Sequence, residues 1–441
     1  MTTRVFYAST LFGAMGLAAA IEAGQFGDRV ERQLLIVSNN SAVPEVTYSF
    51  VDSAAFAPLR RHFDDIVHWN DLVAPLHPAG WVPSRAEMPM LSRLFAERLG
   101  LQDGVSELVL ESIAVAPARS IGMLIADCPI TVYSDGLMSY GPTRDSLPGE
   151  IGLRVTRLLY LDLLPGVTPL LLREYQVDAQ AIPDGAFAKV VEQLPEPAVG
   201  ELAGWPLILG QYLSQLGILT VEEELELHAE MLRSLAARGH RRIVFKPHPA
   251  AGRSHVLPLQ READLLGVEL AVPADTLPAE AWFAAARPEL VVSCFSTALL
   301  TAVRLFDIPA ATVGGELVLE RIVPYENSNR IPATIVDATV PQLRGDGTLA
   351  DPPQRDIAQL LHAVGFCMQA RRHPDLRSAA AAYLASQGRE RYFKSRRLQR
   401  LGLVPAPRYR SAGVRRVVRR CRRLMARLGL GGPAKKPAPR R

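Results

Sequence analysis

The chain has 441 residues, of which 48% are hydrophobic and 21% charged; this balance is typical of soluble globular proteins and excludes a disordered or collagen-like chain. Its length exceeds one ordinary domain and favours two. The net charge of +4 is uneven, because residues 388–441 hold 19 Lys and Arg and one acid, whereas the preceding residues hold 30 basic and 44 acidic residues. An acidic body therefore carries a basic tail.

The apolar N-terminal stretch has two interpretations. As one run, Val5–Ile21 is similar to a signal peptide. It also divides into a strand at Val5–Ala8 and a helix at Ala14–Ala23, and a second strand at Leu34–Val37 follows at the distance expected of a βαβ unit. We favour the second interpretation. No other stretch reaches about 18 uninterrupted apolar residues, so we expect no membrane-spanning helix.

Short apolar runs continue to alternate with helical patterns, which predicts parallel sheets covered by helices. The first half adds strands at Leu108–Glu111 and Ile130–Tyr133 and a helix at Ala118–Asp127. After a Pro- and Gly-rich linker at 195–200, the second half has predicted strands at Pro206–Leu209, Ile243–Phe245 and Leu290–Ser293 and helices at Thr220–Arg238 and Thr297–Leu305.

We therefore expect an α/β protein with two Rossmann-like domains, residues 1–195 and 206–388, that face each other across a ligand cleft. Thr220 and Glu223 form a capping-box pattern at the start of the longest predicted helix. A further helix at Ile357–Gln387 is predicted to cross back to the first domain. Residues 389–441 form a basic tail, which we expect to be partly disordered.

Within the tail, residues 412–430 predict an amphipathic helix, with apolar residues on one stripe and seven arginines around it. Such a helix suits the anionic face of a bilayer, so we expect a cytoplasmic protein that is peripheral to the inner leaflet. A solvated helix packed on the acidic body is one alternative and RNA binding is another. The tail has no interleaved aromatic residue to stack on bases, and the acidic body disfavours nucleic acid.

The four cysteines, Cys128, Cys294, Cys367 and Cys421, are widely spaced and form no CxxC pair or zinc-ligand pattern. We therefore expect reduced thiols in a reducing compartment. The chain also lacks a P-loop, a GxGxxG fingerprint, an HExxH motif and an Asp-x-Asp pair, so no metal-bridged nucleotide-diphosphate site is indicated.

Asp135 directly follows the predicted strand Ile130–Tyr133, and Gly136 allows a sharp turn there. A carboxylate at the end of a strand reaches a ligand cleft, where it can accept a proton from a substrate hydroxyl. The alternative is an ordinary Asp-Gly turn.

His248 lies between Pro247 and Pro249 at the end of another predicted strand. The two prolines restrict the backbone, so the imidazole is held outward and can donate a hydrogen bond or a proton to a departing phosphate. A structural or surface histidine is the alternative.

Ser296 and Thr297 connect a third predicted strand to a helix. The unpaired N–H groups at the start of a helix attract phosphate, and two hydroxyls add further donors. Simple capping of the helix by Ser296 or Thr297 is the alternative. Nothing in the sequence pairs the neighbouring Cys294 with a base, so a nucleophilic thiol is not indicated.

Together and in this order, the three segments resemble the bacterial alpha-2,8-polysialyltransferase-like family, whose members are GT-B sialyltransferases with a D/E-D/E-G, an HP and a Ser-Ser/Thr motif. The resemblance extends from about Val5 to Val340. Lys246-Pro247-His248-Pro249 fits the HP motif and Ser296-Thr297 fits the Ser-Ser/Thr motif.

The resemblance implies inverting, metal-independent transfer of sialic acid, or of a related sugar acid, from a CMP-activated donor to a glycan or glycolipid hydroxyl. This reaction needs no cofactor and would serve the synthesis of capsule polysaccharide or another surface glycan. The resemblance also implies that the acidic motif supplies the base and that His248 assists the leaving group. The residues expected to bind the donor are Lys246, His248, Pro249, Glu280, Ser296 and Thr297. The residues expected to lie near the donor or the acceptor are Thr10, Ser134, Gly136 and Arg144.

The sequence departs from the family pattern at Ser134, which replaces the first acid of the D/E-D/E-G motif. Asp135 would then have to serve as the base. Two alternatives stay open, namely a transferase of polyol phosphate from a CDP-activated donor and a non-catalytic, membrane-docked protein that binds a nucleotide or a glycan.

Overall fold

The computed structural model of the chain describes residues 2–134, 136–248, 256–388 and 390–405. Asp135, Pro249, Cys421 and the predicted tail helix at 412–430 lie outside the described residues. The chain divides into two compact units, Met1–Phe393 and Lys394–Arg441. The described part of the second unit contains the short helix α15 (Ser395–Arg400). The predicted domain limits, residues 1–195 and 206–388, stay a prediction.

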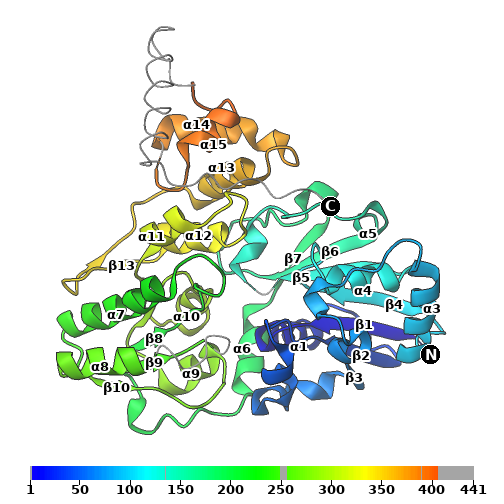
Figure 1. Cartoon of the computed structure of the whole chain (residues 1–441), viewed down its shortest axis with the longest axis horizontal. Helices are drawn as coiled ribbons and strands as arrows, with labels where there is room; N and C mark the ends of the chain where they lie inside the picture. Colours follow the sequence, from blue (N-terminus) through cyan, green and yellow to red (C-terminus); the bar gives the residue numbers. More distant parts are fainter. Residues whose placement is uncertain (1, 135, 249–255, 389, 406–441) are drawn as a thin grey trace, which may run out of the picture. The chain divides into compact units, whose positions relative to one another are not determined.

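Among the described residues, the first sheet has seven parallel strands in the order β3-β2-β1-β4-β5-β6-β7 (Figure 1). Its strands are β1 (Thr3–Ala8), β2 (Arg32–Val37), β3 (Asp65–His68), β4 (Val105–Leu110), β5 (Ile130–Ser134), β6 (Val155–Leu161) and β7 (Asp178–Ile182). The strand order reverses between β1 and β4, which is the place where doubly wound sheets bind ligands.

A second sheet, also of seven described strands, repeats this pattern in the order β10-β9-β8-β11-β12-β13-β14, with the last pair antiparallel. Its strands are β8 (Leu207–Leu209), β9 (Arg242–Lys246), β10 (Glu269–Ala271), β11 (Val291–Ser293), β12 (Ala310–Thr312), β13 (Gln342–Leu343) and β14 (Leu349–Ala350). Its order reverses between β8 and β11. The predicted α/β class with two Rossmann-like halves is confirmed.

Helices connect the strands and cover the sheets (Figure 1). The described helices of the first unit are α1 (Leu11–Glu22), α2 (Trp69–Val73), α3 (Met88–Leu99), α4 (Ala118–Leu124), α5 (Gly149–Gly152), α6 (Asp184–Glu192), α7 (Val221–Ala237), α8 (Val256–Leu266), α9 (Ala279–Ala286), α10 (Ala298–Phe306), α11 (Gly315–Arg321), α12 (Arg330–Thr339), α13 (Ile357–Gln369) and α14 (Arg377–Gln387). At the start of α7, Thr220 and Glu223 form the predicted capping box.

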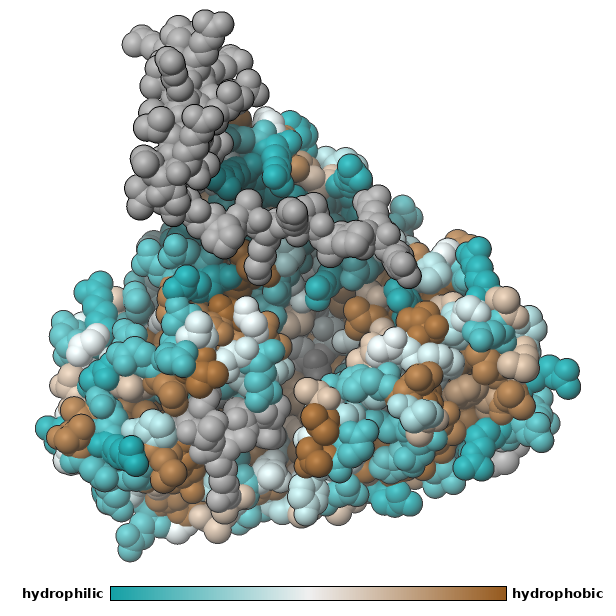
Figure 2. Space-filling view, in the orientation of Figure 1, coloured by the Kyte–Doolittle hydropathy of each residue, from teal (hydrophilic) through white to brown (hydrophobic). Residues whose placement is uncertain are grey.

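The apolar N-terminal stretch forms the buried strand β1 and the helix α1, as the βαβ interpretation predicts. All residues of β1 are buried, and Val5 and Phe6 have no exposed surface. Of the helices in the described part of the chain, none has the length and apolar character needed to cross a bilayer. On the face drawn in Figure 2, hydrophobic residues of the described part are interspersed with hydrophilic ones.

The prediction of one helix over Ile357–Gln387 is wrong, because α13 ends at Gln369 and α14 begins at Arg377. Pro374 lies in the break, where its ring and missing N–H prevent the helix from continuing. The predicted return to the first half is confirmed in this break. The guanidinium of Arg372 donates to the carbonyls of Thr143 and Arg144 at 2.6 and 2.8 Å and to Ser146 Oγ at 2.9 Å.

We expect Arg372→Ala to lower the free energy of unfolding by about 1–2 kcal/mol, because two carbonyls and a hydroxyl lose a charged donor. Chemical denaturation measures this loss. Arg371→Ala is the matched control, since Arg371 is the exposed neighbour of Arg372. Equal stability of the two variants would show that this crossing contributes nothing to the fold.

Candidate functional site

The predicted acidic motif lies at the carboxyl end of β5. Ser134 is the last residue of β5, and after Asp135 the chain continues through Gly136 into the short 3-10 helix η6 (Leu137–Tyr140). Ser134 and Gly136 are half-buried. The segment therefore ends a central strand at an edge of the sheet where polar groups reach a ligand.

The acidic motif meets the Ser-Thr motif across 160 residues of sequence. The Leu137 backbone N–H donates to Thr297 Oγ1 at 3.5 Å. Gly136 lies so near that a Cβ built on it would be 3.1 Å from the same oxygen. Two of the three predicted motifs therefore come together, one from each sheet.

Ser296 and Thr297 precede α10, and both are half-buried. Ser296 Oγ accepts a hydrogen bond from Ala298 N at 3.2 Å, which agrees with the capping alternative. Thr297 occupies the cap position itself, yet its side chain makes no capping hydrogen bond. Its hydroxyl oxygen accepts from Leu137 instead. The start of α10 thus combines two hydroxyls with backbone N–H groups, a combination suited to an anion.

His248 follows β9, which lies beside β8 in the sheet. Burial lowers the pKa of His248 to about 4, and the charge of Glu224 acts in the opposite direction. The imidazole is therefore neutral at neutral pH. The end of β8 approaches the HP segment closely, because a Cβ on Gly210 would lie 3.3 Å from the Pro247 Cα.

Lys246, the first residue of the HP segment, and Glu280 are both buried. Lys246 Nζ lies 3.2 Å from Asp275 Oδ1, and Trp282 Nε1 donates to the same oxygen. Burial lowers the pKa of Lys246, and Asp275 opposes this shift. Glu280 accepts a hydrogen bond from Thr301 at 2.8 Å, and its burial raises the pKa of its carboxyl. Both side chains are held by protein groups, and their contact with a donor stays a prediction.

Two further predicted residues have local roles in this structure. Thr10 Oγ1 caps α1 by accepting a hydrogen bond from Gly13 N at 2.9 Å. The exposed Arg144 guanidinium lies 3.9 Å from Asp145, and the Arg144 carbonyl accepts from Arg372. Burial raises the pKa of the Cys294 thiol, which agrees with the prediction that it is not a nucleophile.

Sequence reasoning missed polar residues that flank both points of strand-order reversal. In the first sheet, the buried Glu111 follows β4 and accepts hydrogen bonds from Ser9 N at 2.7 Å and from Tyr133 Oη at 3.2 Å. In the second sheet, Gln211 and Tyr212 follow β8. For Glu111 the available signal was a polar residue directly after a buried strand, whereas Gly210 separates Gln211 and Tyr212 from β8.

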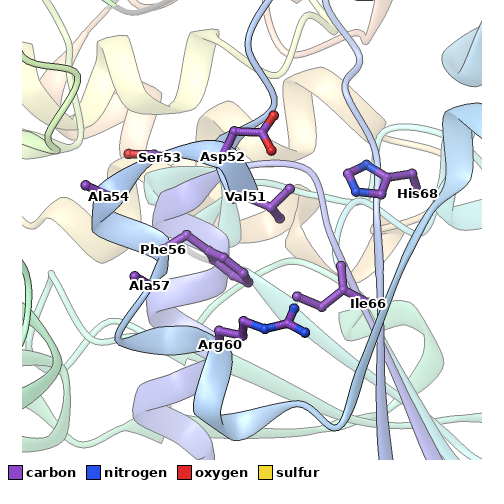
Figure 3. Close-up of a pocket in the computed structure, with 9 residues that line it drawn as sticks. All are labelled: Val51, Asp52, Ser53, Ala54, Phe56, Ala57, Arg60, Ile66 and His68. Carbon is purple, nitrogen blue, oxygen red and sulfur yellow. The ribbon is translucent and has the colours of Figure 1, made fainter.

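A cavity of about 480 Å³ lies elsewhere in the first half, between the edge strand β3 and the short 3-10 helices that precede it (Figure 3). It is lined by Val51, Asp52, Ser53, Ala54, Phe56, Ala57, Arg60, Ile66 and His68. None of the predicted site residues lines it. The cavity is therefore separate from the place where the motifs meet.

The family model of Alpha-2,8-polysialyltransferase (POLYST) matches residues 4–314, which is more than half of the chain. The chain belongs to this family. The predicted family is therefore confirmed, with a match that ends at residue 314 rather than at the predicted Val340, and the protein is a sialyltransferase-like glycosyltransferase. No curated protein sequence matches this polysialyltransferase-family chain.

Two solved structures are examples of what this polysialyltransferase-family chain is similar to. A sialyltransferase from Photobacterium damselae is 14% identical, with 76% of this chain and 96% of that chain covered and a TM-score of 0.41. A UDP-GlcNAc 2-epimerase from Neisseria meningitidis, bound to UDP-GlcNAc, is 11% identical, with 86% and 94% covered and a TM-score of 0.46. Likenesses of this size say nothing about the reaction.

We expect Gly136→Ala to lower the free energy of unfolding by about 1 kcal/mol, because its Cβ meets Thr297 Oγ1 at 3.1 Å. Thr297→Ala removes that oxygen, so adding it to Gly136→Ala should recover part of the loss. Chemical denaturation of both single variants and the double variant measures this coupling. Gly149→Ala is the control, since nothing lies within 4 Å of its added Cβ. Strict additivity would mean that the two residues do not touch in solution.

Proposed function

We propose that this polysialyltransferase-family protein transfers sialic acid, or a related sugar acid, from a CMP-activated donor to a glycan hydroxyl. The observation that supports it most is the contact of the acidic-motif segment with Thr297, because it places the residues beside Asp135 next to a helix start suited to phosphate. His248 follows β9, which is separated from β11 by β8 alone.

The proposed reaction is a single displacement with inversion. Asp135 accepts the proton of the acceptor hydroxyl, and that oxygen forms a bond to the anomeric carbon of the donor. The bond from the anomeric carbon to the phosphate oxygen breaks, and its electron pair leaves with CMP. His248 donates a hydrogen bond or a proton to the departing phosphate, and the acceptor proton stays on Asp135 until solvent takes it.

The proposed donor needs no metal or cofactor. CMP leaves as a monophosphate, whose charge can be balanced by the N–H groups at the start of α10, the hydroxyls of Ser296 and Thr297, and His248. Glu280 is proposed to lie near the ribose, and Lys246, which is paired with Asp275, to support the HP segment. The proposed acceptor is a glycan or glycolipid at the cytoplasmic surface of the membrane. The basic tail would bind that membrane surface.

We expect purified protein, given CMP-sialic acid and a panel of glycan acceptors, to release CMP above the blank. His248→Ala should lower kcat by roughly 10²- to 10⁴-fold, because the leaving phosphate loses its proton donor, and Asp135→Ala should lower it by a similar factor. Arg371→Ala should keep the wild-type rate. If no CMP is released from CMP-sialic acid or from any other CMP-activated sugar acid, the proposal is refuted. Turnover of a CDP-activated polyol donor would instead identify the protein as a polyol-phosphate transferase.

We also expect CMP binding to take up protons through His248. Free His248 is neutral above pH about 4, whereas a bound phosphate raises the pKa of the imidazole by adding negative charge. Between these two pKa values the complex holds more protons than the free protein, so affinity for CMP rises as pH falls through that window. Calorimetry in two buffers with different ionisation enthalpies measures the uptake.

His248→Gln is the control for this titration, because the phosphate of CMP ionises over a similar pH range and its own contribution remains in the variant. The proton uptake of the wild type should exceed that of His248→Gln. Equal uptake by both proteins would show that the imidazole does not meet the phosphate.

A further inference from the structure

The loop after β8 lies between the two motifs that are proposed to bind the donor. β8 pairs with β9, which precedes His248, and with β11, which precedes Ser296. Gln211 Oε1 accepts a hydrogen bond from the backbone N–H of Phe295 at 3.0 Å. On the other side, the ring of Tyr212 packs on the imidazole of His248, with centroids 4.3 Å apart and planes at 39°.

A buried carboxylate fixes the residues that follow Tyr212. Glu224, in the first turn of α7, has no exposed surface. Its carboxylate accepts from Leu213 N at 2.7 Å, from Ser214 N at 3.0 Å and from Ser214 Oγ at 2.6 Å. Both carboxylate oxygens are thereby used, and the loop has little freedom to shift relative to α7.

Tyr212 and Glu224 both contribute to the surroundings of the imidazole of His248. The Tyr212 ring packs on the imidazole of His248, and burial of the imidazole favours its neutral form. Glu224 supplies the negative charge that favours the protonated form. Tyr212 from the loop thus contacts the imidazole, and Glu224 from α7 acts on it through its charge.

We infer that Tyr212 and Glu224 are positioning residues for His248, with Glu224 fixing the loop and Tyr212 holding the imidazole in one orientation toward the leaving phosphate. The identity of that phosphate rests on the proposed function, whereas the packing of the three residues does not. If Glu224 and Tyr212 had only a structural role, substituting them would lower the stability of the protein and leave the pKa of His248 unchanged.

The first test separates positioning from stability by kinetics. Tyr212→Phe keeps the ring and should keep kcat within about 3-fold, whereas Tyr212→Leu should lower kcat roughly 10-fold with the KM for the CMP-activated donor nearly unchanged. In a His248→Ala background, Tyr212→Leu should lower kcat no further. An equal fall in both backgrounds would overturn the inference. Tyr48→Leu is the control, since Tyr48 is 90% exposed.

The second test needs no turnover. In an NMR titration of the free protein, Tyr212→Leu should raise the pKa of His248 from about 4 toward its ordinary value of 6.5, because the imidazole gains access to water. Glu224→Gln should not raise it, because the variant loses the favourable charge. An unchanged His248 titration in Tyr212→Leu would overturn the inference. If no donor is turned over by the wild type, the proposed function fails and this titration alone decides the inference.

Discussion

The close approach of Gly136 to Thr297 is the contact on which the candidate site depends. The end of β5 and the start of α10 belong to different sheets, and 160 residues separate Leu137 from Thr297, to which it donates. A side chain at position 136 would have to occupy space next to Thr297 Oγ1. The glycine of the acidic motif is needed here for proximity rather than for an unusual backbone angle, since its φ of −143° is open to any residue.

The repeated strand order explains why the polar residues gather where they do. In both sheets the first strand lies beside the fourth, so the loops that follow these strands diverge and leave space between them. Ser9 and Glu111 flank that point in the first sheet, and Gln211 and Phe295 flank it in the second. In each case a side-chain oxygen from one loop accepts a backbone N–H of the other, which holds the two loops in register.

Much of the fold could be predicted from the sequence because its central strands are buried on both faces and read as continuous apolar runs, as in Leu34–Val37 and Val291–Ser293. The four edge strands and the interior strands β6, β12 and β13 were missed. β3 and β7 begin with acidic residues, β6 is interrupted by Thr156 and Arg157, and β10, β12, β13 and β14 have three residues or fewer. Their strand character comes from pairing with a neighbour, which local sequence does not contain.

The candidate site, like the fold, could be predicted from the sequence only in part. The HP and Ser-Thr segments were recognisable because proline, histidine and hydroxyl residues follow buried strands, and the capping box at Thr220 was recognisable from two residues. The parts played by Glu111, Tyr212 and Glu224 depend on which strands are neighbours in the sheet. Glu224 in particular is one of three consecutive glutamates in the first turn of α7, and its burial alone distinguishes it from the other two.

The electrostatics of the site favour hydrogen bonds over fixed positive charge. The ammonium of Lys246 is buried and lies beside Asp275, so its charge is largely balanced within the protein. His248 is neutral in the free protein because burial opposes its protonation. A nucleoside monophosphate bound at the start of α10 would therefore bring the charge that protonates His248, and a neutral sugar acceptor would not. On this argument the imidazole becomes an acid only when the leaving group is in place, which limits proton donation to the step that needs it.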